Sequence, residues 1–146
     1  MIAYFDTGIL LKAYVAEKDS AAADAMILEV AAPIPFTHLH EIELRTALRV
    51  KRGRGEIADG ELKLALRDLQ EDINAGRLKK PIYDLPDVFR KAEELSAKHA
   101  TATLCRSLDI LHVATAVVIG SMNFFTFDAR QASLATRAGL KVKTRS

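Results

Sequence analysis

Two acidic residues stand directly after apolar runs that are typical of buried strands. Asp6 follows the run 2–5, and Asp128 follows the run 123–127. In open α/β sheets, ligands bind beyond the carboxyl ends of the strands, so a carboxylate at either place is a candidate for chemistry. Helix capping is the alternative for both: Asp128 with Gln131 fits a capping box, and Asp6 could cap the segment that follows it.

A third acid, Asp109, is difficult to explain by helix stability alone. It lies in the first turn of a predicted helix from Ser107 to Ile119, where a carboxylate favours the helix dipole by about 0.3–1 kcal/mol. The apolar residues around it predict burial, and a buried unpaired carboxylate costs several kcal/mol or shifts its pKa. Because the dipole effect is too small to compensate, we expect a cation near Asp109.

The predicted helix over 38–51 carries two acids that face different ways. At 100° per residue, Glu43 falls in the middle of the apolar face. Glu41 falls on the opposite side, four residues before Arg45, where an ion pair between successive turns is the ordinary explanation. An inward-facing carboxylate normally needs a partner, so Glu43 is the fourth candidate.

If these four acids converge, they form a strongly negative site. Adjacent carboxylates cannot all ionise without a counter-charge. Hard oxygen ligands select Mg²⁺ or Mn²⁺ over softer metals. The chain has a single cysteine, Cys105, which excludes a zinc site built from cysteine pairs. Such a site suits phosphoryl chemistry, because a bound metal polarises phosphate and lowers the pKa of a bound water.

The elements that must position these acids alternate in type along the chain. The apolar runs predict strands at 2–5, 33–37, 80–84, 123–127 and 140–143. One helix is predicted from about Ser20, whose hydroxyl is a candidate N-cap. Further helices are predicted over 38–51, 59–76, 86–99, 107–119 and 128–139. This alternation predicts an α/β fold: a single domain over 1–146, with a mostly parallel central sheet of about four to five strands and helices on both faces.

Several other polar residues have structural explanations. His112 lies one turn from Asp109 on the same face, and we interpret it as a hydrogen-bonded core histidine rather than a catalytic base. His38 and His40 are expected to face solvent. The basic stretch 45–54 is either an RNA-backbone contact or a solvated face at a helix end.

Length, composition and charge limit the class of protein. With 146 residues, 49% hydrophobic and 27% charged, the chain has the composition of one globular domain. The net charge of +2 is too balanced to indicate a nucleic-acid partner alone. The apolar stretch 108–127 contains Asp109, which would be costly inside a bilayer. We therefore expect a cytoplasmic protein with no membrane partner.

The four acids lie in segments that resemble the motifs of PIN-domain ribonucleases. These segments run from Tyr4 to Tyr14, from Glu43 to Leu48, from Arg106 to Ala116, and from Phe125 to Gln131 with Gly139 to Val142 beyond. The resemblance follows the motif order and covers nearly the whole chain. In its short single-domain form the sequence is similar to the VapC-type toxins of toxin–antitoxin pairs.

The resemblance implies a Mg²⁺-dependent endoribonuclease, with Mn²⁺ as a substitute, that is usually a homodimer and is held inactive by a cognate antitoxin. Carried over by residue, the metal and catalytic site would comprise Asp6, Glu43, Asp109 and Asp128. Thr126 would place a hydroxyl nearby. Arg106 would sit at the rim of the pocket and contact the phosphate of RNA.

Two other functions remain open. One is a PIN-like module that binds RNA or a protein partner without turnover, in which the acids persist for structural reasons. The other is a phosphatase with Asp6 as its nucleophile. The partner acid that such a phosphatase carries two residues further on is absent, because Gly8 occupies that position.

Overall fold

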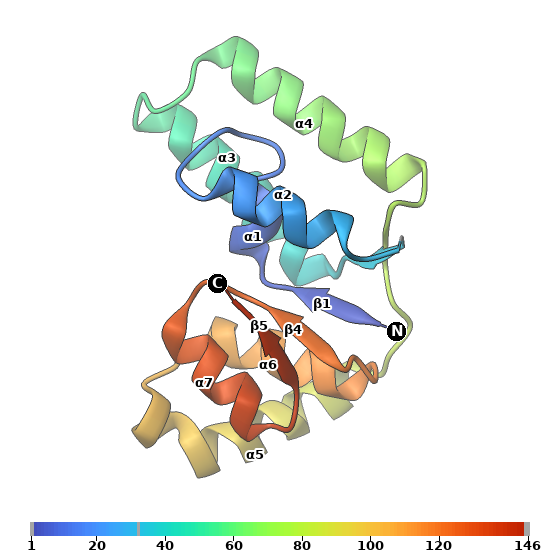
Figure 1. Cartoon of the computed structure of the whole chain (residues 1–146), viewed down its shortest axis with the longest axis vertical. Helices are drawn as coiled ribbons and strands as arrows, with labels where there is room; N and C mark the ends of the chain where they lie inside the picture. The colour runs from blue at the N-terminus through green and yellow to red at the C-terminus, as the bar shows by residue number, and fades with distance from the viewer. Residues whose placement is uncertain (1, 32, 145–146) are drawn as a thin grey trace. The chain divides into compact units, whose positions relative to one another are not determined.

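Strands and helices alternate along the chain, as the apolar runs predict (Figure 1). The computed structural model describes residues 2–31 and 33–144. In chain order the elements are β1 (Ala3–Phe5), α1 (Thr7–Leu11), α2 (Ser20–Leu28), β2 (Ile34–Pro35), α3 (His38–Gly53), α4 (Asp59–Asn74), β3 (Leu78–Lys79), α5 (Leu85–Thr103), α6 (Ser107–Val118), β4 (Asn123–Phe125), α7 (Ala129–Arg137) and β5 (Lys141–Lys143). The chain divides into two units: unit 1 is Met1–Asp6 with Pro81–Ser146, and unit 2 is Thr7–Lys80.

Unit 1 is built on a three-stranded parallel sheet in the order β1-β4-β5. The pairing continues past β1, because the Asp6 N–H donates to the carbonyl oxygen of Phe125 at 2.9 Å. It also continues past β4, where the Thr126 N–H donates to the carbonyl oxygen of Lys143 at 3.0 Å. Since the strands are parallel, their carboxyl ends meet at one edge of this sheet. Asp6 and Thr126 therefore share that edge.

One face of this sheet is covered by α5, α6 and α7. Tyr4 of β1 and Phe124 of β4 are fully buried and stack with ring centroids 5.5 Å apart. The core that they join also contains Val88, Ala92 and Leu95 of α5, Ile110, Val113, Ala114 and Ala116 of α6, and Leu134 and Ala135 of α7. His112 of α6 is 1% exposed, and its Nδ1 lies 2.6 Å from the Tyr4 hydroxyl. The prediction of a hydrogen-bonded core histidine is confirmed.

Unit 2 pairs β2 with β3 in parallel and begins α3 with a side-chain cap. Thr37 Oγ1 accepts from the His40 N–H at 3.1 Å, and His40 Nδ1 accepts from the Thr37 N–H at 3.0 Å. This is a capping box in which a histidine ring replaces the usual Glu or Gln. His38 is exposed, as expected, but the same expectation for His40 is wrong. His40 is fully buried because its ring nitrogen completes the cap.

Tyr14 of unit 2 makes a hydrogen bond that ties stability to pH. Its hydroxyl donates to Asp72 Oδ2 at 2.5 Å, and burial, followed by this bond and the Asp72 charge, raises the pKa of Tyr14 above the usual range. In the unfolded chain the tyrosine pKa is about 10. The folded state therefore favours the neutral phenol, and this stabilisation is complete below about pH 10 and is lost as the pH rises towards the folded pKa.

We therefore expect the wild type to lose stability above pH 10 more steeply than Tyr14→Phe. A single proton limits the difference in slope to about 1.4 kcal/mol per pH unit. Urea unfolding of both proteins at pH 8, 10 and 11 measures it. Tyr83, whose pKa burial also raises, titrates in both proteins and cancels in the comparison. Parallel pH profiles would show that the Tyr14–Asp72 bond does not persist in solution.

Three sequence-based expectations about the elements are corrected by the structure. The strand predicted at 80–84 lies at 78–79, where Lys79 accepts at 2.8 Å from the N–H of Phe36, and Pro81 has no N–H for further pairing. The strands form a three-stranded sheet and a two-stranded pair, each within its own unit, instead of one predicted sheet. Ser20 does not cap α2, because the N-cap position belongs to Asp19 and Ser20 Oγ accepts from the Glu17 N–H.

The end of α7 agrees more closely with the prediction. Gly139 follows α7 with φ +93°, a left-handed conformation that glycine adopts without strain, and so ends the helix where expected.

In the described part of the chain, no helix combines the length and the apolar character needed to span a bilayer.

Candidate functional site

Asp6 is held at the sheet edge by its main chain and by a side-chain contact with Gln131. Its N–H bonds to Phe125, and its side chain is half-buried. The amide nitrogen Nε2 of Gln131 donates to Asp6 Oδ1 at 3.3 Å. A neutral donor orients this carboxylate without cancelling its charge. Asp6 is therefore a positioned anion at the carboxyl end of β1.

Asp109 reaches the same amide from α6. It lies in the first turn of that helix, is half-buried, and its main-chain carbonyl oxygen accepts from Gln131 Nε2 at 3.5 Å. One amide thus contacts two of the predicted acids, which come from parts of the sequence more than a hundred residues apart. The structure therefore brings Asp6 and Asp109 into one neighbourhood within unit 1.

Thr126 completes this neighbourhood. Its side chain is 0% exposed, and its hydroxyl donates to Gln131 Oε1 at 2.7 Å. The hydroxyl oxygen of Thr126 also accepts from the Asp128 N–H at 3.0 Å. The prediction that Thr126 places a hydroxyl near the acids is consistent with this geometry. Its contacts are with neighbouring protein groups, so a role in binding substrate stays a prediction.

Asp128 is a helix cap in this structure. The residue is exposed, and its Oδ1 accepts from the N–H groups of Arg130 at 2.8 Å and Gln131 at 3.0 Å. The capping interpretation is thereby confirmed for Asp128. The reciprocal half of a capping box is not made by Gln131, whose side chain turns to Thr126 and Asp6 instead. The cap occupies one carboxylate oxygen, and a further role of Asp128 as a metal ligand stays a prediction.

The pKa of the Cys105 thiol is affected by the negative charge of this region. Burial raises the pKa of Cys105 most strongly, the hydrogen bond with Thr103 lowers it, and the charges of Asp109 and Asp128 add smaller increases. Both carboxylates are therefore near enough to act on one buried group in unit 1. A raised pKa also leaves little thiolate at neutral pH, so the Cys105 thiol is a poor nucleophile.

Glu43 belongs to unit 2, where it is half-buried on α3. Its Oε1 accepts from the hydroxyl of Thr7 at 2.8 Å, so the first residue of α1 supplies the polar partner that an inward carboxylate needs. The assignment of Glu43 to the metal site stays a prediction.

Glu41 is the solvated ion-pair residue that the helix geometry predicts. It pairs with Arg45 one turn later, at 3.2 Å, and with Lys80 at 2.6 Å. The hydrogen bond from Lys80 is the largest of the effects that hold the pKa of Glu41 below its usual range. This carboxylate therefore has a structural explanation.

The basic stretch 45–54 is largely engaged with acids of its own unit. Lys51 pairs with Glu17 at 2.6 Å, and Arg52 pairs with Asp59 at 2.5 Å. These pairs favour a solvated face over an RNA contact. Arg106 is different: it is exposed and occupies the N-cap position of α6, three residues before Asp109. Its contact with phosphate stays a prediction.

The chemistry of the donor atoms decides which metal ion this region could hold. Among the residues in 2–31 and 33–144, the side chains form no group of three or more His, Cys, Asp or Glu that could hold a metal ion. Mg²⁺, however, is commonly held by one or two carboxylates, with waters and substrate phosphates as its other ligands. Asp6 and Asp109 offer oxygen donors of that type in one neighbourhood. By donor type the residues of unit 1 suit Mg²⁺, and binding of the metal, by these two acids or by the four-acid set, stays a prediction.

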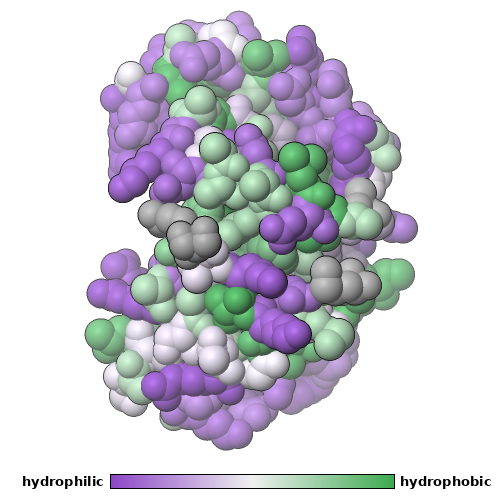
Figure 2. All heavy atoms as spheres, viewed as in Figure 1, coloured by the Kyte–Doolittle hydropathy of each residue, from purple (hydrophilic) through white to green (hydrophobic). Residues whose placement is uncertain are grey.

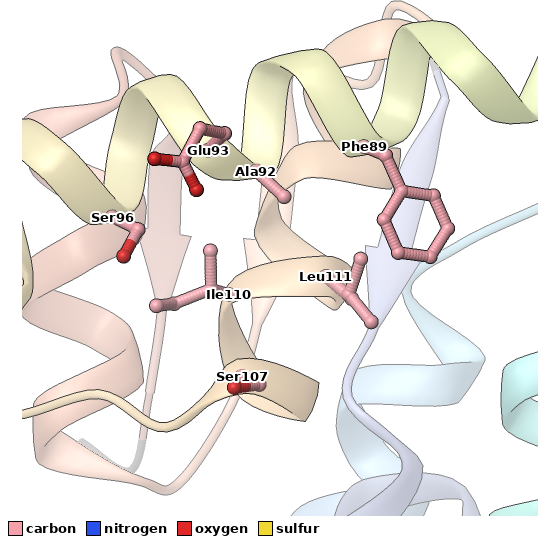
Figure 3. A pocket seen from close by; sticks show the side chains of 7 residues that line it. All are labelled: Phe89, Ala92, Glu93, Ser96, Ser107, Ile110 and Leu111. Carbon is pink, nitrogen blue, oxygen red and sulfur yellow. The ribbon is translucent and has the colours of Figure 1, made fainter.

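A groove on unit 1 lies apart from these acids. It has a volume of about 210 Å³ and lies between α5 and α6 (Figure 3). Its walls are Phe89, Ala92, Glu93 and Ser96 of α5 and Ser107, Ile110 and Leu111 of α6. Asp109 is on the same helix as the last three residues but does not line the groove. The groove therefore does not contain the predicted acids.

Gln131 is the residue of this site that sequence reasoning did not assign. Its position three residues after Asp128 indicated only a capping-box partner. The available signal was the polar series Thr126, Asp128 and Gln131 after a buried strand, which places several hydrogen-bonding groups at one sheet edge. Sequence spacing alone does not show which of them the Gln131 side chain contacts.

The fold and the site define a class of protein. Unit 1 is an α/β arrangement of parallel strands flanked by helices, with acidic residues at the carboxyl edge of the sheet. The family model of the PIN domain matches residues 3–136, so the chain belongs to the PIN domain family.

A solved structure supports the same fold. The chain is similar to the crystal structure of FitAcB from Neisseria gonorrhoeae, with a TM-score of 0.69 over 97% of this chain and 96% of that chain. The sequence identity is 14%, so this likeness shows the fold alone. No curated protein matches the sequence. The predicted fold class, an α/β PIN fold with parallel strands flanked by helices, is confirmed.

Proposed function

We propose that this protein is a Mg²⁺-dependent endoribonuclease and the toxin of a type II toxin–antitoxin pair. The observation that carries the proposal is the Gln131 amide, which donates both to the Asp6 carboxylate and to the main chain of Asp109. This contact joins the first and third acidic motifs at the edge of the sheet where α/β proteins bind ligands. Membership of the PIN domain family supports the same assignment.

Asp6 and Asp109 hold the metal, and Glu43 and Asp128 add negative charge or further ligands. When bound, Mg²⁺ polarises the scissile phosphate and lowers the pKa of a coordinated water. Arg106, exposed at the start of α6, contacts the RNA phosphate. Mn²⁺ replaces Mg²⁺, because both prefer oxygen ligands.

We also propose two protein partners, a cognate antitoxin and a second copy of the chain. Large apolar side chains are exposed on α5 and at the start of α6, among them Leu85, Phe89 and Leu108. Figure 2 shows hydrophobic residues reaching the surface between hydrophilic ones. Exposed apolar side chains that gather on neighbouring helices are typical of protein interaction surfaces.

The direct test is cleavage of RNA by the purified chain. We expect cutting of a structured RNA in the presence of Mg²⁺, and at least a roughly hundredfold loss of rate with excess EDTA, because the metal supplies several kcal/mol of transition-state stabilisation. Adding back Mg²⁺ or Mn²⁺ should restore the rate. Tight RNA binding without turnover in either metal would instead favour the binding module. Transfer of phosphate to Asp6 would favour the phosphatase.

A cellular experiment tests the toxin assignment separately. Induction of the wild-type chain should arrest growth, and co-expression of a small protein encoded next to it should relieve the arrest. An active ribonuclease that leaves growth unaffected would keep the enzymatic proposal and reject the toxin.

A further inference from the structure

Gln131 is a buried amide whose polar atoms are all directed at the candidate site. Its side chain is 0% exposed. Its Oε1 accepts from the Thr126 hydroxyl at 2.7 Å, and its Nε2 donates to Asp6 Oδ1 at 3.3 Å and to the main-chain oxygen of Asp109 at 3.5 Å. A buried amide is costly unless it is hydrogen-bonded, and here both ends have partners.

The chemistry of these partners leaves one orientation for the amide. The contacts on the Nε2 side are a carboxylate oxygen and a carbonyl oxygen, and neither can donate. A flipped amide would place its own oxygen against both of them. On the other side, the Asp128 N–H donates to Thr126 Oγ1, which leaves the hydroxyl proton free to point to Gln131. The assignment of Nε2 as the donor to Asp6 therefore follows from the network.

The network links three elements through one side chain. Gln131 belongs to α7, Asp6 to the end of β1 and Asp109 to the first turn of α6. The Asp128 carboxylate caps the start of α7. The Asp128 N–H donates to Thr126 Oγ1, and the Thr126 hydroxyl in turn holds the Gln131 amide. The Asp6 carboxylate is thus held by a neutral donor that leaves its charge in place.

We propose that Gln131 is a positioning residue that orients the Asp6 carboxylate for a divalent metal, with Thr126 holding the amide in the required orientation. The inference rests on the proposed function, because it assigns Asp6 a metal. Neighbours that orient metal ligands typically account for about 10–100-fold in metal affinity.

The test is isothermal titration of Mn²⁺ into the purified full chain, with no substrate present. We expect Gln131→Met, which keeps the length of the side chain and removes both hydrogen-bonding groups, to weaken Mn²⁺ binding by about 10–100-fold. Thr136→Val is the matched control. It removes a hydroxyl from the same helix, where Thr136 bonds only within α7, and should leave the affinity unchanged. Equal affinity of Gln131→Met and the wild type would overturn the proposal.

A second pair of variants separates orientation from folding. Thr126→Val removes the hydroxyl that holds the amide, whereas Thr126→Ser keeps it. We expect Thr126→Val to bind Mn²⁺ more weakly and Thr126→Ser to restore the affinity to within about twofold of the wild type. A purely structural network would lower the free energy of unfolding in Thr126→Val and leave the Mn²⁺ affinity unchanged, which would also overturn the proposal. This pair decides the question if Gln131→Met does not fold.

The outcomes also distinguish this inference from the proposed function. A wild-type chain that binds no Mn²⁺ would reject the metal centre, and the role of Gln131 would fail with it. A wild-type chain that binds Mn²⁺ with the same affinity as Gln131→Met and Thr126→Val would reject only the positioning role.

Discussion

Replacing Asp109 by asparagine is expected to abolish Mg²⁺-dependent RNA cleavage while the fold survives. The change is nearly isosteric, and the main-chain oxygen that accepts from Gln131 is kept. It removes one full charge from a site that needs anions to hold a divalent cation. Loss of several kcal/mol of transition-state stabilisation corresponds to a rate reduction of at least about a hundredfold. Single-turnover cleavage of a labelled RNA measures this effect, and Asp6→Asn should behave in the same way.

Two further variants make the result specific. Glu93→Gln removes an exposed carboxylate from α5, at the groove that none of the predicted acids lines. This variant should cleave at the wild-type rate. Asp128→Asn keeps an acceptor that caps α7 well but removes the charge. If Asp128→Asn cleaves at a rate close to that of the wild type, Asp128 caps α7 and has no role as a metal ligand. Wild-type cleavage by Asp109→Asn and Asp6→Asn would reject the nuclease assignment.

Truncation of Phe124 is expected to have the largest effect on stability. Phe124 lies in β4, the central strand of the three-stranded sheet, is 0% exposed, and stacks on Tyr4 within the core of unit 1. Phe124→Ala should lower the free energy of unfolding by about 3–5 kcal/mol, because buried aromatic area is lost and a cavity remains. Urea denaturation followed by circular dichroism provides the measurement.

The matched control lies two residues away. Met122 is 64% exposed just before β4, so Met122→Ala should change the free energy of unfolding by less than about 0.5 kcal/mol. Equal destabilisation by the two substitutions would mean that the stacked pair Tyr4–Phe124 is not packed in solution as it is in this structure.

The strands β1 and β4 were predictable because they are buried on a parallel sheet. Such strands read as continuous apolar runs, as 2–5 and 123–127 do for β1 and β4. The helix from Ser107 was predictable for a similar reason, since an apolar segment of that length has to be a buried helix. The strand at 78–79 was misplaced because a two-residue strand is defined by its partner β2 more than by its own residues.

Side-chain contacts show the limit of sequence reasoning more clearly. Helical periodicity correctly separated Glu41, which pairs at the surface, from Glu43, which faces inward to Thr7. It could not show that the ring of His40 would close a cap, because a histidine is rare in that role. Local pattern describes which face a side chain occupies, but the atom that it meets there depends on the neighbouring element.

The types of residue in the chain were sufficient to indicate an α/β fold and to single out Asp6, Asp109 and Asp128, because strand ends and helix starts are local features of a sequence. The order β1-β4-β5 and the meeting of Asp6 with Asp109 at Gln131 were decided only when the chain folded. The β1–β4 pairing and the contact of Gln131 with Asp6 join residues more than a hundred positions apart. Their hydrogen bonds depend on distances that packing sets, and no spacing along the chain encodes them.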